Sequence, residues 1–144
     1  MNKQKNFNKY TKLFLAGLFI VAIFDAALVM SISIRSIIYF VEGKWFIPII
    51  QFLPLTFFTT LFIFELKLII KFYKNFKLID KQSKERHIIA FDQTIEQNPK
   101  AYKTERIFLY LSCSLIVLFG GLGLIPLFFL LNGEKAHKQW KEQK

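Results

Sequence analysis

Asp25 is the residue whose position most strongly suggests chemistry. It lies within residues 13–34, LFLAGLFIVAIFDAALVMSISI, and is the only charged residue of that run. About 20 helical apolar residues cross the ~30 Å hydrocarbon core of a bilayer. A carboxylate near the middle of such a helix costs at least ~2.5–3.5 kcal/mol, so it usually faces protein or water. Such an acid either relays a proton or cation, pairs with a partner's cation, or fixes helix packing. We expect packing for Asp25, with the relay as the alternative.

Small and hydroxyl-bearing residues are expected at the depth of Asp25. Threonine hydroxyls of the next apolar run can donate to a carboxylate, and glycines of the last run allow helices to approach closely. Two alanines flank Asp25 in a small-xxx-small pattern. A proline near the last glycines weakens that helix, which indicates a hinge or a hairpin tip. The predicted intramembrane polar and packing residues are Asp25, Ala22, Ala26, Thr56, Thr59, Gly120, Gly121, Gly123 and Pro126.

Other reactive residue types form no recognisable site. Cys113 is the only cysteine and lies in an apolar run, where a thiol is inert. His87 and His137 lie in separate polar segments without metal-ligand spacing. No Lys-Ser or Lys-Thr follows the glycine-rich run that begins at Gly120, so a nucleotide loop is not expected there. We predict no catalytic, cofactor or metal site, and no enzyme.

Composition favours a membrane protein. Of the 144 residues, 53% are hydrophobic and 18 are phenylalanine, and the net charge is +10. Apolar runs and charges are segregated along the chain, as they are when lipid covers the apolar surface. Basic residues that flank membrane spans on the cytoplasmic side explain the charge better than a nucleic-acid partner does. The abundance of Lys, Ile, Phe and Asn is typical of a low-GC bacterium or its phage.

The elements follow from the apolar runs. We predict an all-α integral membrane protein with three transmembrane helices and a cytoplasmic, basic, amphipathic helical loop. The break at 120–126 leaves two interpretations of the third run, one kinked span or a re-entrant hairpin, because its two pieces are each too short to cross. The predicted segments are a frayed basic tail (1–12), three transmembrane helices (13–34, 46–64 and 107–131), the helical loop (65–106) and a polar tail (132–144).

The loop carries a row of lysines. At 100° per residue they fall within one arc of about 140°, opposite an apolar face. Such a helix binds the anionic inner leaflet or stands as a stalk, and orientation of the protein is the simpler role. A short second helix is expected before Pro99. The predicted lipid-facing basic stripe consists of Lys67, Lys71, Lys74, Lys77, Lys81 and Lys84.

Basic residues also predict the orientation. With three spans, the N-terminal tail and the loop share a side with fourteen basic residues, against six on the other. That side is expected to be cytoplasmic. The C-terminal tail would then lie outside with four lysines, against the rule, and a hairpin at residues 120–126 would return it to the cytoplasm.

Two function classes follow. The first is a small non-catalytic, multi-pass protein of the cell membrane that acts through helix–helix contacts as an accessory, regulatory or immunity-type partner. The alternative is an oligomeric transporter or a pore, such as a phage holin, that uses Asp25 and the break at 120–126. The expected partners are anionic inner-leaflet lipids and a membrane protein or further copies of this chain.

Overall fold

The protein is entirely helical over the residues that the structure describes. The computed structural model describes the backbone of residues 2–118 and 120–143 and the side chains of residues 7–118 and 120–143. This confirms the predicted all-α class. The helices are α1 (Asn2–Val41), α2 (Phe46–Leu78), α3 (Arg86–Gln97), α4 (Pro99–Leu118) and α5 (Leu124–Glu142).

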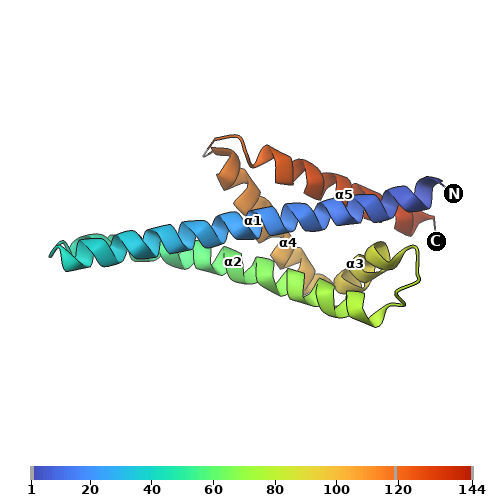
Figure 1. Cartoon of the computed structure of the whole chain (residues 1–144), viewed down its shortest axis with the longest axis horizontal. Coiled ribbons are helices and arrows are strands. Elements are labelled where there is room, and N and C mark those ends of the chain that lie inside the picture. The colour runs from blue at the N-terminus through green and yellow to red at the C-terminus, as the bar shows by residue number, and fades with distance from the viewer. Residues whose placement is uncertain (1, 119, 144) are drawn as a thin grey trace.

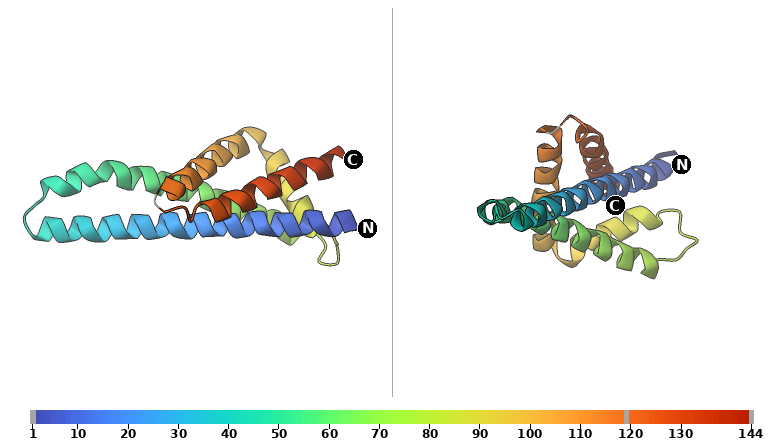
Figure 2. Two further views of the ribbon diagram at one scale, coloured as in Figure 1. Left: turned by 90° about the horizontal axis from the view of Figure 1, so that it is seen from above. Right: turned by 60° about the vertical axis from the view of Figure 1, so that its left-hand side comes forward.

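The two longest helices form an antiparallel hairpin that projects beyond the rest of the molecule (Figures 1 and 2). A tight turn joins them, and the Ser36 hydroxyl donates to Gln51 Oε1 at 2.6 Å across the pair. Two expectations differ from the structure here. Residues 35–41, which lie between the first two predicted transmembrane helices, and residues 2–12, predicted as a frayed tail, are both helical. The first part lacks Gly and Pro, and tertiary packing of buried Phe7 and Thr11 stabilises the second.

Helix α5 runs antiparallel along the N-terminal half of α1, and this contact forms much of the core. At Gly133 a Cβ atom would lie 2.5 Å from the Cβ of Phe14, so only glycine lets the two helices approach this closely. Phe14 in turn contacts Phe91 of α3, with ring centroids 4.6 Å apart and the ring planes tilted by 57°. The C-terminal segment 132–144, expected to be a polar tail, is therefore largely part of a packed helix.

The run 107–131 is not one helix. It is divided between α4 and α5, and the chain reverses direction between them (Figure 2). Gly120 and Gly121 have φ of 150° and 78°, which other residues rarely adopt, so the break lies at the glycines. As a result the C-terminus lies at the same end of the molecule as the N-terminus (Figure 2).

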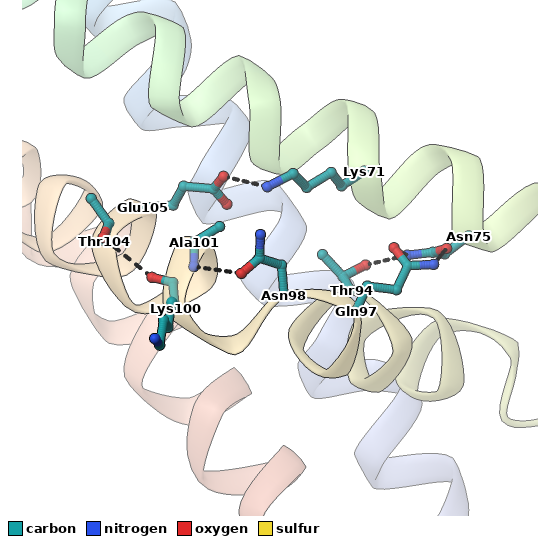
Figure 3. A network of polar contacts seen from close by, with 9 residues as sticks. All are labelled: Lys71, Asn75, Thr94, Gln97, Asn98, Lys100, Ala101, Thr104 and Glu105. Carbon is teal, nitrogen blue, oxygen red and sulfur yellow. Dashed lines mark hydrogen bonds and ion pairs between the residues drawn. The ribbon is translucent and has the colours of Figure 1, made fainter.

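Polar side chains connect α2 to α3 and to α4 (Figure 3). The Lys71 ammonium lies 2.6 Å from the Glu105 carboxylate, which is 3% exposed. Asn75, also buried, donates to Thr94 at 3.0 Å and accepts from Gln97 at 2.8 Å. The predicted short helix before Pro99 corresponds to α3, which packs against α2 through these contacts.

Candidate functional site: a buried carboxyl pair in an apolar helical hairpin

Asp25 lies in a buried polar cluster at the meeting point of α1, α2 and α4. Its side chain is fully buried, and the Ser112 hydroxyl of α4 donates to Asp25 Oδ2 at 2.9 Å. Glu65 of α2 is 1% exposed, and its carboxyl group lies beside the carboxyl group of Asp25 and the hydroxyl of Ser112. The thiol of Cys113, fully buried as well, is close to both acids. Three helices thus bring two carboxyl groups together in an otherwise apolar interior.

The pair lacks a compensating positive charge within the described residues. Asp25 Oδ1 and both carboxylate oxygens of Glu65 accept no hydrogen bond from a neighbouring donor there. Two buried carboxylates side by side repel each other strongly and are both poorly solvated, so they do not both stay ionised. A proton shared between them satisfies the arrangement, because the protonated acid then donates to the ionised one. The site can therefore hold one proton.

The predicted partners of Asp25 lie elsewhere. Thr56 and Thr59 donate to backbone carbonyls of their own helix, at Phe52 and Leu55, with distances of 2.8 and 2.7 Å. Their hydroxyls are satisfied within α2, and Ser112 occupies the position expected for them. Of the flanking alanines, Ala22 is buried at 5% exposure and Ala26 is half-buried.

The predicted glycines and proline lie at the reversal of the chain rather than against Asp25. Gly120 is exposed and Gly121 half-buried, both in the turn that precedes α5. Gly123 is buried, and a Cβ there would lie 2.7 Å from the carbonyl oxygen of Cys113. The backbone of buried Pro126 lies close to α1, 3.1 Å from where a Cβ of Gly17 would be. These residues shape the α4–α5 reversal and its contact with α1.

Sequence reasoning missed Glu65 and Ser112 as members of the site. Glu65 is the first residue of the predicted helical loop (65–106) and, like Ser112, was not singled out. A signal existed for Glu65, since it lies nineteen residues after the start of α2 while Asp25 lies sixteen before the end of α1. An antiparallel hairpin places such positions within about one helical turn of each other. Ser112 lies on α4, outside the α1–α2 hairpin, so spacing within the hairpin does not predict its position.

The far half of the hairpin exposes large apolar side chains around both of its helices. Two helical segments are long and apolar enough to cross a membrane, Phe7–Val41 and Phe46–Leu78. Only 6% of the most apolar stretch of α2 is buried, so it is not the core helix of a globular domain. Neighbouring residues such as Ile37 and Ile38, which point about 100° apart, are both exposed. The large exposed side chains here are Met30, Ile34, Ile37, Ile38, Phe40, Val41, Trp45, Phe46, Ile49, Ile50, Phe52, Leu53 and Phe57.

The predicted lysine stripe is only partly helical. Helix α2 ends at Leu78, so Lys81 and Lys84 lie in the irregular segment that follows it. Lys71 is tied to Glu105. The ammonium groups of Lys67 and Lys77 lie over aromatic rings, 5.5 Å from the centroid of Phe64 and 4.6 Å from that of Tyr73. Lys74, the remaining residue of the predicted stripe, is exposed.

The remaining titratable residues make ordinary packing contacts. His137 Nε2 lies 2.8 Å from Asp92 Oδ1 and joins α5 to α3. His87 lies against the ring of Phe76. Within the described residues, no group of three or more His, Cys, Asp or Glu side chains is arranged to hold a metal ion. Comparisons with protein-family models, curated proteins and solved structures find no match to this chain.

Proposed function

We propose that this chain is a small integral membrane protein that acts through helix–helix contacts as an accessory or regulatory partner of another membrane protein. The observation that carries the proposal is the projecting α1–α2 hairpin, whose apolar side chains are exposed around both helices. Exposed apolar area of this extent requires lipid or protein against it. The hairpin crosses the bilayer twice, and α4–α5 enters it as a re-entrant hairpin.

The distribution of charge supports this placement. Charged groups from α2, α4 and α5 lie next to the apolar region, where Lys71 pairs with Glu105, and Arg106 with Glu134 at 2.6 Å. In this arrangement the N-terminal segment, the 65–106 loop and the C-terminal segment share one side. Together they carry eighteen of the twenty basic residues, which favours the cytoplasm. The C-terminal lysines then no longer conflict with the rule.

The face that suits a partner helix lies on α1. Ala27 and Ser31, one turn apart, line a shallow groove of about 450 Å³ together with Met30, Ile34 and Arg35. Small residues let another helix approach closely. Arg35 forms no ion pair within the described residues, and a guanidinium near the membrane is stabilised by a facing acid or carbonyl. A partner helix with a carboxylate at this level fits the groove.

The test is site-specific photocrosslinking in cells of the source organism. A crosslinker at Ala27 or Ser31 should join the chain to one defined membrane protein, and Arg35→Gln should reduce that product. A crosslinker at Phe52 on α2 serves as the matched control, because it reports random lipid-phase encounters. Equal product patterns from the two helices would contradict a specific α1 interface.

A second function, proton or cation transfer in an oligomer, is favoured by the Asp25–Glu65 pair. Ionisable residues inside membranes commonly mark ion pathways. The described part of one chain encloses only a narrow interior, so further copies would have to complete a path. Purified protein in liposomes should then dissipate a proton gradient, and Asp25→Asn and Glu65→Gln should both abolish the flux while the protein stays inserted. Absence of flux from the native protein would contradict this second function.

A further inference from the structure

A groove between α1 and α2 crosses the boundary between the apolar and the charged parts of the molecule. Its volume is about 610 Å³. Its two ends differ in character. Phe19, Ile69 and Ile70 line the apolar end, whereas Lys74, Lys77 and His87 line the other. Between them lie aromatic side chains of α2, including Phe72 and Tyr73.

The charged end of this groove has a surplus of positive charge. Lys74 and Lys77 form no ion pair within the described residues. Burial, and then the charges of Lys12 and Arg86, lower the pKa of His87, so both cations act on this end from α1 and α3. The Nδ1 atom of His87 is buried and has no hydrogen-bond partner there. Two lysines thus line the charged end of the groove, and two further cations lie close enough to His87 to act on it.

We propose that this groove binds one anionic phospholipid of the inner leaflet. An acyl chain lies along Phe19, Ile69 and Ile70, and the phosphate of the headgroup lies at Lys74, Lys77 and His87. The inference rests on the membrane placement proposed above, which puts the lysines at headgroup depth. It goes beyond general attraction of basic residues to the leaflet, because it assigns one lipid to one groove.

The two-part lining is what selects a lipid over other anions. A free phosphate or a nucleotide would leave the apolar end open to water, and an acidic peptide would bury charge against it. A phospholipid matches both ends at once, because its chain and its charged headgroup are joined at the depth where the groove changes character. A second acyl chain remains in the surrounding bilayer.

The test uses the full-length chain, purified in detergent and analysed by native mass spectrometry. Phosphatidylglycerol and phosphatidylcholine with the same acyl chains are added separately. The native protein should retain one phosphatidylglycerol and much less phosphatidylcholine. Lys74→Gln/Lys77→Gln should lower phosphatidylglycerol retention by about tenfold. The matched control, Lys103→Gln/Lys138→Gln, removes two exposed lysines elsewhere and should retain the lipid as the native protein does.

Two further arms separate the contributions. Leu15→Trp fills part of the groove and should reduce retention of phosphatidylglycerol, with unchanged helix content by circular dichroism as the folding check. Inorganic phosphate should not displace the lipid, whereas displacement would assign the site to free phosphate. Equal retention of both lipids, or equal loss in the lysine variant and its control, would overturn the proposal. Because the purified chain is tested without any partner, these outcomes are independent of the crosslinking result.

Discussion

At the residue scale, the Asp25–Glu65–Ser112 cluster is the feature whose energetics are most specific. Each side chain is fully or almost fully buried, and each comes from a different helix. An apolar replacement of one member leaves the others buried without a partner, which costs more than the hydrogen bond contributes. The effect of a substitution in this cluster on stability therefore depends on whether the new side chain can still form hydrogen bonds.

Asp25→Asn should be tolerated, because the amide can accept from Ser112 and donate to Glu65. Asp25→Leu should lower the free energy of unfolding by about 1–3 kcal/mol, since it leaves the Glu65 carboxyl and the Ser112 hydroxyl unpaired. Thermal unfolding in detergent measures both. Ser114→Ala is the control, because Ser114 is exposed and donates only to its own helix at Tyr110. Equal stability of the Leu variant and the native protein would contradict the packing role of Asp25.

His87 predicts a pH dependence outside the apolar region. Burial, followed by Lys12 and Arg86, lowers its pKa below the ordinary value of 6.5. The unfolded chain therefore takes up a proton first as the pH falls, so the stabilising contribution is complete above the ordinary pKa and is lost below it. We expect the melting temperature to fall between about pH 8 and about pH 5, and His87→Gln to reduce that fall. An identical pH profile in the variant would contradict this.

At the element scale, contact between α1 and α5 decides how the helices pack at the end of the molecule where both termini lie. Gly133 allows the two helices to approach at Phe14, and Arg106 and Tyr102 of α4 reach Glu134 one residue further along α5. The reversal at the glycines sets α5 on this path. An amphipathic pattern alone does not specify it, because α5 could equally have continued α4.

Gly133→Ala should destabilise the protein by about 1–3 kcal/mol, because the added methyl group would lie 2.5 Å from the Cβ of Phe14 and would force the helices apart. Lys135→Ala on the exposed side of α5 is the matched control and should change stability by less than about 0.5 kcal/mol. Chemical unfolding monitored by Trp140 fluorescence on a Trp45→Phe background measures both. A neutral Gly133→Ala would show that α5 does not pack on α1 as described.

At the scale of the whole molecule, both ends of the described chain lie at one end of the molecule. The turn between α1 and α2 lies at the opposite end (Figure 1). With the hairpin in the bilayer, the proposed topology has two crossings and one re-entrant hairpin. It differs from three crossings in one measurable respect, the side on which the C-terminal segment lies.

Cysteine labelling of intact cells distinguishes the two topologies on a Cys113→Ala background. Cysteines at Lys84 and Lys138 should both be protected from an impermeant reagent, and a cysteine at Lys44 in the hairpin turn should react. Permeabilised cells provide the control for accessibility of all three sites. Labelling of position 138 but not of position 84 from outside would restore the three-span topology.

The sequence by itself determined the helical class, the apolar hairpin and the short helix before Pro99. These follow from local composition and periodicity, which act over one or two helical turns. The sequence also singled out Asp25 as an acidic residue within an apolar run. Only the tertiary structure decided that Asp25 meets Glu65 and Ser112, that α5 turns back along α1, and that residues 2–12 are helical. Those outcomes depend on register, crossing angle and close approach between residues far apart in the chain, and side-chain packing fixes them.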